Sequence, residues 1–574
     1  MKNNFFIKLI KSIFFYEIIE VKKKISLINY FIKNISIPTF FLFIFNRNKY
    51  NPIKQSKFKE FISENKKKWK NHDKKISNNN FILVESFVNH PAYTLSNIVI
   101  GFFLSKKFNY KIMGLIRNHD IKSEVILRSY GCKKIIFFKD PNLLERLYYL
   151  IKTILIIGNE NKTEKASKIK INGVDIGLIA YDTFIRYKYK PTLNIINSHY
   201  LIYFAEALYA QNFIKKHISK NKIKISVLAE TQYVPLSVFF QTFLKKNINI
   251  FTRSGLESFT VRMYKNWKQR YHYRETVSQK LFNWLNKNHK TKSIQKVKKI
   301  YNNKFKKNTF GVDEVILGLR SKNYKKLNYN SNKKKKNVVL FLSHLLDGNF
   351  VYGPRKYSKD VYSGSKFIID QLPKLKNVNW LIKKHPNHNF LKSSYDFNDQ
   401  IKEYEKKYDH IKLLNDDVSP TSLLNLADIG VTLSGSVGVE YPAFGIPCVF
   451  IEKTYYSNLK FFNKINSKKD IQKTLQNIHK LKIPTKKYIE NCLLYLFVKD
   501  ILLRNRCYLI PKHIPSRSLN EKLFWQNAKK NLIEFSFSKD EFYQMLEIQL
   551  NLNLRHTINF NVISKTSKKF NDFD

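Results

Sequence analysis

Short apolar runs alternate with longer mixed segments along the first half of this chain. The runs FILVESF (81–87), KIMGLI (111–116) and KKIIFF (133–138) predict buried strands, and the amphipathic segments between them predict helices. The alternation continues through ISVLAE (225–230) and NINIFTR (247–253). Strands that alternate with helices in this way predict a parallel sheet with helices on its faces.

A second alternation begins at residue 337 and is the clearer of the two. Its predicted strands are NVVLFLSH (337–344), VNWLIKKHP (378–386), IKLLN (411–415), IGVTLS (429–434) and PCVFIE (447–452). An α/β fold with two Rossmann-like domains facing a cleft follows, since ligands in such sheets bind beyond the carboxyl ends of the strands.

The predicted domain organisation has helical additions at both ends. Residues 262–336 read as helical and rich in lysine, and the tail from about 556 reads as frayed. The expected parts are a basic amphipathic N-terminal segment (1–75), a first Rossmann-like domain (76–320), a lysine-rich linker (321–336), a second Rossmann-like domain (337–500) and a helical C-terminal extension (501–574).

The charge balance favours anionic partners. Lys and Arg number 103 against 43 acidic residues, a net charge of +60, and such a field attracts phosphorylated substrates, acidic glycans, lipid headgroups or nucleic acid. The lysines are scattered along the chain, as are many Asn and Ile residues. Most of the charged side chains are therefore expected to lie on the solvent-exposed surface. No nucleic-acid-binding motif is present, and no nucleic-acid partner is expected.

The cysteines and the N-terminal residues indicate the cellular compartment in which the chain is expected. The four cysteines lack CxxC spacing and any accompanying His cluster, which indicates free thiols in a reducing compartment and no zinc site. Residues 27–45 are apolar but interrupted by Lys33 and Pro38, which disfavours a membrane span. A cytoplasmic chain is expected, with its basic, aromatic N-terminus either on the anionic inner membrane surface or packed as a helix pair.

The stretch LSGSVGVE (433–440) has the layout of an anion-binding turn. A strand ends at Ser434, Gly435 allows the turn and a close ligand approach, and Ser436 is placed to cap a helix whose N–H groups would face a phosphate. Glu440, one turn further on, is placed to reach a ribose hydroxyl. The alternative is a short connection in which Gly435 and Gly438 serve only packing.

A second polar strand end precedes this turn. Lys384, His385 and Pro386 end the strand 378–386, where an imidazole can donate a hydrogen bond to a phosphate oxygen. The acidic stretch NDD (415–417) precedes a helix, so we interpret it as a loop with capping residues. No metal or other cofactor is therefore expected.

The order of these motifs resembles a known family. A lysine followed by HP, then D-x-S-x-x-x-L-L-x-x-A-D, S-G-S-x-G-x-E and G-x-P is similar to bacterial capsule-polysaccharide glycosyltransferases of GT-B fold, in particular the group that includes Kdo transferases. The matching residues are Lys384, His385, Pro386, Asp417, Ser419, Asp428, Ser434, Gly435, Ser436, Gly438, Glu440, Gly445 and Pro447.

The first half carries the resemblance as well. The stretch INGVDIGLIAYDTFIR resembles the family segment G-x-x-I-G-x-x-x-Y-D-T-x-x-R, with matches at Gly173, Gly177, Tyr181, Asp182, Thr183 and Arg186. FILVESFVNHPAY and FLSHLLDGNFVYG, with Asp347, are similar to its first strands in the two domains. The resemblance spans roughly residues 80–500. AETQYVPLSVFF (229–240) departs from it, because the usual His and Gly are absent, which leaves the acceptor open.

The resemblance implies a metal-independent transferase. A sugar would pass from a nucleotide-activated donor, CMP-linked donors included, to a growing surface polysaccharide or lipid-linked glycan. The donor nucleotide would be bound by Lys384, His385, Ser434, Gly435, Ser436, Gly438 and Glu440, with His385 also acting in catalysis.

The acceptor side requires a general base. The candidates are Glu85, which ends a strand, His90 and Asp182. The candidates for binding acceptor or sugar groups are His90, Arg186, Arg253 and Asp347. A capping role for Glu85 and surface salt bridges for the arginines are the alternatives.

Other functions remain compatible with the same motifs. SVGVEYPAFGIP (436–447) is close to the pattern of teichoic-acid-type glycerol- or ribitol-phosphate transferases, although these enzymes usually carry two adjacent serines after an aspartate. A nucleotide-sugar 2-epimerase shares the two-domain fold. A nucleic-acid-binding protein would rest on the charge alone.

Overall fold

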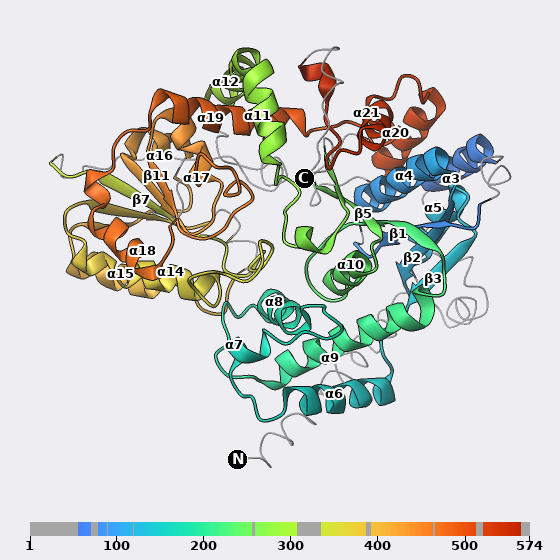
Figure 1. Cartoon of the computed structure of the whole chain (residues 1–574), viewed down its shortest axis with the longest axis horizontal. Coiled ribbons are helices and arrows are strands. Elements are labelled where there is room, and N and C mark those ends of the chain that lie inside the picture. The colour runs from blue at the N-terminus through green and yellow to red at the C-terminus, as the bar shows by residue number, and fades with distance from the viewer. Residues whose placement is uncertain are drawn as a thin grey trace.

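Two sheets form the cores of two Rossmann-like domains in the computed structural model (Figure 1). This α/β, GT-B-like arrangement is the one that the alternation of strands and helices predicted. The structure describes residues 56–70, 78–306 and 334–563, apart from gaps at 89, 119, 255–258, 386–387, 389–391, 419, 463–464 and 512–520.

The first sheet has six strands in the order β3-β2-β1-β4-β5-β6. All neighbouring pairs are parallel except β5 and β6, which are antiparallel. The chain winds outward from β1 on one side and from β4 on the other, so the strand order reverses between these two strands. The strands are β1 (Phe81–Ser86), β2 (Lys111–Arg117), β3 (Lys134–Phe138), β4 (Ile223–Leu228), β5 (Asn249–Ser254) and β6 (Thr260–Tyr264).

The second sheet has five strands, all parallel, in the order β11-β10-β7-β8-β9. Its order reverses between β7 and β10. The strands are β7 (Asn337–Phe341), β8 (Asn379–Lys383), β9 (Ile411–Leu413), β10 (Ile429–Thr432) and β11 (Cys448–Phe450).

Helices cover both faces of each sheet. In β1, Leu83 joins one apolar core while Ile82 and Val84 join the core on the opposite face. Burial on both faces explains why the strands read as continuous apolar runs. The main helices are α3 (Ser56–Trp69), α4 (Pro91–Phe108), α5 (Ile121–Ser129), α6 (Leu143–Ile157), α7 (Thr163–Ala166), α8 (Ile176–Lys188), α9 (Ser198–Phe213), α10 (Leu236–Lys245), α11 (Gln279–Asn288), α12 (Lys290–Lys306), α14 (Val361–Ile369), α15 (Asn398–Lys407), α16 (Pro420–Leu426), α17 (Val437–Glu440), α18 (Lys468–Gln476), α19 (Lys486–Phe497), α20 (Glu521–Glu534) and α21 (Glu541–Asn551).

The C-terminal tail pairs with the edge of the first sheet. The expectation of helix over 262–336 was wrong at its start, because β6 continues to Tyr264, and right for α11 and α12. The expectation of a frayed tail was wrong for residues 556–563, because the Met263 N–H donates to the Arg555 carbonyl (2.6 Å) and the Thr557 N–H donates to the Val261 carbonyl (3.1 Å). The tail thereby covers the open edge of β6, which would otherwise leave backbone groups unpaired.

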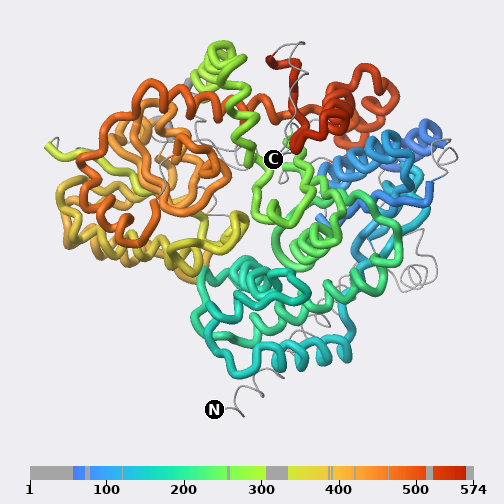
Figure 2. The backbone as a smooth tube through the Cα atoms, viewed as in Figure 1, coloured from blue at the N-terminus to red at the C-terminus, as the bar shows by residue number. Residues whose placement is uncertain are grey.

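The chain crosses between the domains more than once. Helices α11 and α12 precede the expected linker, yet their apolar side chains join the core of the second domain. Helix α20 returns to the first domain, where Trp525 lies 4.8 Å from Phe58 of α3 between ring centroids. Figure 2 shows α3 and α20, blue and red, side by side. The domain limits given above therefore stay predictions.

Two expected segments fall largely outside the described residues. Residues 1–55 and 71–75 of the expected N-terminal segment, and residues 321–333 of the expected linker, are among those not described. Within the described ranges, no helix combines the length and the apolar character needed to cross a bilayer.

Candidate functional site

The carboxyl edges of the two sheets face each other. Tyr233, in the loop after β4, donates its hydroxyl to Asp347 Oδ1 in the loop after β7 (2.6 Å), and the Gly348 N–H donates to the Tyr233 hydroxyl (3.1 Å). In doubly wound sheets, ligands bind beyond the carboxyl ends where the strand order reverses. The two reversal points, β1/β4 and β7/β10, therefore define the candidate site.

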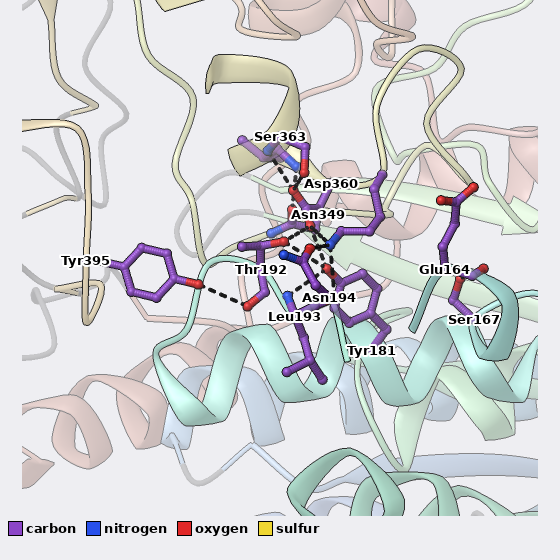
Figure 3. Close-up of polar contacts among 12 residues, drawn as sticks. Glu164, Ser167, Tyr181, Thr192, Leu193, Asn194, Asn349, Asp360, Ser363 and Tyr395 are labelled. Carbon is purple, nitrogen blue, oxygen red and sulfur yellow. Dashed lines mark hydrogen bonds and ion pairs between the residues drawn. The ribbon is translucent and has the colours of Figure 1, made fainter. Parts of the chain in front are cut away.

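Helix α8 fastens the second domain to the first through Tyr181. The Tyr181 hydroxyl and the Thr192 hydroxyl each donate to Asp360 Oδ2 at 2.5 Å (Figure 3). Asp360 is fully buried and caps α14, with its other oxygen accepting from the Ser363 N–H at 2.7 Å. One carboxylate thus serves as a helix cap in one domain and as an acceptor for the other domain.

Two more residues of the α8 motif hold neighbouring loops. Thr183 Oγ1 accepts from the Val234 N–H (3.0 Å), which fixes the loop after β4. Arg186 lies 3.5 Å from Asp347 Oδ1 and 5.8 Å from the Tyr233 ring centroid. Asp347 and Arg186, predicted to contact acceptor or sugar groups, therefore contact each other across the domain boundary.

Asp182 is buried at the same boundary. It lines a small cavity together with Gln232, Tyr271 and Phe350, and its Oδ1 has no hydrogen-bond partner among the described residues. Burial and the nearby Asp347 carboxylate raise the pKa of Asp182 to about 8, against the opposing effects of the Arg355 and Arg186 guanidinium groups and of the Asn349 N–H. A carboxyl group that holds its proton near neutral pH suits a positioning role better than the predicted role of a general base.

We expect the Asp182→Asn variant to change the pH dependence of stability. The pKa of Asp182 in the folded chain, about 8, exceeds its ordinary value of 3.8, so the folded state holds a proton that the unfolded chain releases. The stabilisation is fully present below the ordinary pKa and is lost as the pH rises through about 8. Between pH 5 and 9, the wild-type melting temperature should fall relative to that of the variant by roughly 1–3 °C. Parallel melting temperatures across this range, or loss of all turnover in the variant, would contradict the assignment.

The turn after β10 is fixed by neighbouring side chains. Thr432 Oγ1 accepts from the Gly435 N–H (3.0 Å), and the Tyr456 hydroxyl donates to the Gly435 carbonyl (2.7 Å). A Cβ atom on Gly438 would lie 2.1 Å from the Tyr456 hydroxyl oxygen, so this glycine serves packing. Ser434 and Gly435 remain partly exposed at the carboxyl edge.

The helix that follows this turn is shorter than the sequence suggested. Helix α17 has four residues, and the Ser436 side chain makes no capping hydrogen bond. The predicted capping role of Ser436 was therefore wrong, because the chain is already helical at this residue and its hydroxyl cannot reach the N–H groups of a following turn. An anion would be bound by the backbone of the turn rather than by a helix dipole.

Glu440 points toward a neighbouring helix end. Its carboxylate is buried and lies 3.5 Å from the Lys499 ammonium group, which follows α19. A contact with ribose would have to compete with this ion pair. The ribose role of Glu440 stays a prediction, and the present geometry instead joins the turn to α19.

Two histidines meet at the ends of β7 and β8. The rings of His344 and His385 lie edge to face with centroids 5.4 Å apart, and Lys384 forms an ion pair with Asp416 at 3.3 Å. The sequence singled out His385 but passed over His344, although His344 also ends a predicted strand. Pro386 and Ser419 of the family pattern lie outside the described residues.

Glu85 does not have the access that a general base needs. Its carboxylate is fully buried and accepts hydrogen bonds from the Phe87 N–H and, at 2.7 Å, from the Ala229 N–H. Burial raises the pKa of Glu85 to about 7. With both oxygens bound to backbone amides, Glu85 joins the ends of β1 and β4, and its catalytic role stays a prediction that competes with these bonds.

His90 and Arg253 also have local partners. His90 caps α4, with Nδ1 accepting from the Ala92 N–H at 3.3 Å. The Arg253 guanidinium lies 3.8 Å from the ring centroid of Tyr93 and is only 1% exposed, and burial lowers its pKa to about 10. Neither a surface salt bridge nor direct contact with an acceptor fits the buried Arg253 side chain.

Glu230 is the carboxylate at this edge that the sequence analysis missed. It follows β4 at the reversal point, and the side chain is 32% exposed while Arg274 donates to Oε2 at 2.8 Å. Arg274 also donates to the Ala229 carbonyl (2.9 Å), so the pair is tied to the strand end. An acidic residue directly after the predicted strand ISVLAE was the available signal.

A metal site is not evident from side-chain positions. Over the part of the chain that the structure describes, no three His, Cys, Asp or Glu side chains gather as metal ligands would. The polar side chains just after β4, β7 and β8 include Glu230, His344, Lys384 and His385, and carboxylates, imidazoles and ammonium groups suit hydroxyl groups and anions.

Comparisons with known proteins find only remote likeness. Neither the protein-family models nor the curated proteins match this chain. Among solved structures, the KpsC β-Kdo 2,4 transferase of Thermosulfurimonas dismutans is 12% identical, with 50% of this chain and 82% of that chain covered and a TM-score of 0.32.

Two further solved structures are similar at the same level. The wall teichoic acid polymerase TagF is 11% identical over 84% of this chain and 100% of that chain, with a TM-score of 0.20. Anabaena HepE in complex with UDP is 11% identical over 73% of this chain and 95% of that chain, with a TM-score of 0.22. Identities and TM-scores this low assign no function, so the fold rests on the strand orders.

Proposed function

We propose that this chain is a metal-independent glycosyltransferase of GT-B type. It transfers a sugar from a nucleotide-activated donor, with CMP-linked sugars among the candidates, to a growing surface polysaccharide or lipid-linked glycan in the cytoplasm. The observation that supports this most is the direct contact between the loops after β4 and β7. It brings the reversal points of two doubly wound sheets together, and each is a place where such sheets bind ligands.

The donor nucleotide would lie at the β7/β10 reversal. Thr432 and Tyr456 hold the conformation of the turn 434–438. The Gly435 and Gly438 N–H groups bond within the protein, so those of Ser436 and Val437 are the ones proposed to bind phosphate. Lys384 and His385 approach from the end of β8, with His344 beside them. Negative charge builds on the leaving phosphate as the bond from the sugar carbon to the phosphate oxygen breaks, and preorganised donors stabilise it most at that stage.

The acceptor would lie at the β1/β4 reversal. There Glu230 is the exposed carboxylate, and Arg274 fixes its position. In the proposed step, Glu230 takes the proton of an acceptor hydroxyl as that oxygen forms its bond to the donor sugar carbon. The nucleotide leaves with the electron pair of the broken bond, so atoms and charges balance.

Exchanging Glu230 for Gln is expected to reduce turnover by about 100- to 10,000-fold, because the amide cannot accept the proton. Donor affinity should stay unchanged, since Glu230 lies on the acceptor side. Glu85→Gln is the matched comparison: one amide N–H₂ would face a backbone N–H, which costs about 1–3 kcal/mol of stability. Steady-state kinetics measures the loss of turnover, and calorimetry measures the donor affinity and the loss of stability. Normal turnover by Glu230→Gln would remove this residue from the mechanism.

A donor panel tests the function itself. The full chain is screened with CMP-Kdo, CDP-glycerol and UDP-sugars by thermal shift, since a ligand of the native state raises its melting temperature. Nucleotide release is then measured with and without a glycan acceptor. Release from a nucleotide sugar only when acceptor is present supports the proposal. Consumption of CDP-glycerol instead would indicate phosphopolyol transfer. Turnover of a nucleotide sugar without acceptor would indicate an epimerase. RNA affinity that falls steeply with salt, without any donor binding, would indicate a nucleic-acid-binding protein.

A further inference from the structure

Helix α6 is apolar on two opposite faces. Its inner face, with Tyr149, Leu150 and Ile157, packs into the core of the first domain. The outer face carries a second row of apolar side chains, two of which, Leu144 and Leu155, are 77% and 76% exposed. The full outer row is Leu143, Leu144, Leu147, Tyr148, Ile151 and Leu155.

The outer row is a continuous stripe rather than scattered exposure. Residues 144, 147, 148, 151 and 155 follow the spacing of one helix face. Of the 15 large apolar side chains that are exposed among the described residues, six lie on this single helix. Isolated exposed apolar side chains are ordinary in soluble proteins, but a contiguous patch marks an interaction surface.

The stripe forms a ridge at the edge of the molecule. Helix α6 lies along the outer side of the first domain, and α9 packs on its inner side (Figure 1). The pocket beside α6 lies on its other side, where Arg146, Tyr149 and Leu150 face α9. The outer row itself therefore offers a protein partner no groove in which to seat anchor residues. A lipid surface requires no such shape complementarity, because acyl chains and headgroups rearrange around a helix that lies in the interface.

Cations flank the ridge. The Lys152 ammonium group lies 6.0 Å from the Tyr148 ring centroid within the stripe, and Lys139 and Lys162 are exposed at its two ends. Of the acidic residues beside them, Glu145 closes a capping box and Glu160 pairs with Lys165 at 3.3 Å, while Asp140 is exposed next to Lys139. The chain as a whole carries a net charge of +60, which attracts it to anionic headgroups.

We propose that the outer face of α6 docks the protein on an anionic phospholipid surface. The apolar row enters the region between headgroups and acyl chains, Tyr148 lies at the interface, and the flanking lysines reach the phosphates. This surface is distinct from the N-terminal segment 1–75, for which membrane contact was predicted. The proposal does not depend on the chemistry proposed above.

Vesicle binding by the full chain tests this surface. Cosedimentation is measured with vesicles of phosphatidylcholine containing about one quarter phosphatidylglycerol, and with phosphatidylcholine alone. The triple variant Leu144→Gln, Ile151→Gln, Leu155→Gln should lose at least about tenfold in partitioning to the anionic vesicles. Its melting temperature should not fall, because all three side chains are exposed. The control exchanges two other exposed residues, Ile483→Gln and Ile533→Gln, and should bind as the wild type does.

Several outcomes would overturn the proposal. Unchanged binding by the triple variant would place the lipid contact elsewhere, for example in residues 1–75. Equal binding to both kinds of vesicle would refute the preference for anionic lipid. A wild-type dimer that the triple variant dissociates, measured by light scattering without vesicles, would assign α6 to a second copy of this chain.

Discussion

Replacing His385 by Ala is expected to lower the turnover of nucleotide sugar about 100- to 1,000-fold, the usual effect of removing one preorganised donor from a developing negative charge. His385 is the second residue after β8, at the edge where β7 and β10 also end. The side chain is partly exposed and its ring meets His344 edge to face. The fold should therefore be retained, and steady-state kinetics with the preferred donor measures the loss.

The control for this variant is another histidine of the same domain. His479 lies beside Leu481, whose carbonyl accepts from Lys336 immediately before β7 (3.4 Å), and thus at the opposite edge of the sheet. His479→Ala should transfer sugar at the wild-type rate. Normal turnover by His385→Ala, or an equal loss in both variants, would show that the end of β8 does not bind the donor phosphates.

Replacing Asp360 by Ala is expected to destabilise the contact between the domains by about 2–4 kcal/mol. The change removes the cap of α14, worth about 1 kcal/mol, and leaves the buried Tyr181 hydroxyl without its acceptor, at about 1–3 kcal/mol. The Thr192 hydroxyl also loses this acceptor, but it is only partly buried and can turn to water. Tyr181→Phe removes the bond from Tyr181 to Asp360 and the bond that the Leu193 N–H donates to Tyr181, but it keeps the cap of α14 and the bond from Thr192 to Asp360, so it should cost about 1–2 kcal/mol. Denaturant unfolding and amide hydrogen exchange at α14 and at residues 190–195 measure both effects.

Asp370, just after the last residue of α14, provides the control. Its carboxylate forms an exposed ion pair with Lys366 at 2.8 Å, and such pairs contribute about 0–1 kcal/mol. Asp370→Ala should therefore leave both measurements close to the wild type. If Asp360→Ala were no more harmful than Asp370→Ala, Asp360 would not be the shared acceptor of the two domains. Transfer should fall with Asp360→Ala, because the loop that carries His344 ends at this residue.

The motif of helix α8 that contacts Asp360 has a role in holding the domains together. The segment Y-D-T-x-x-R was interpreted from the sequence as part of the reacting site, with Asp182 as a candidate base. In the structure, Tyr181, Thr183 and Arg186 each contact a loop of the domain boundary. Spacing along a helix shows which side chains share a face, but it does not show whether that face meets substrate or protein.

The sequence alone determined the strands of the two sheets and the fold class of this protein. Strands buried on both faces need unbroken apolar runs, and surface helices need amphipathic ones, so both patterns are local and readable. The polar residues that end β8 and β10 could be identified for the same reason, since they directly follow such runs. His344 and Glu230 carry the same signal at the ends of β7 and β4.

Only the tertiary structure decided how these parts meet. Strand order placed the reversal points, and packing buried Glu85 and Arg253 while leaving Glu230 partly exposed. The partners of Asp360 and of the tail after Leu554 lie far away in the chain, on other elements. Burial and pairing depend on such distant neighbours, and these neighbours determine whether a carboxylate becomes a base, a cap or a link between domains.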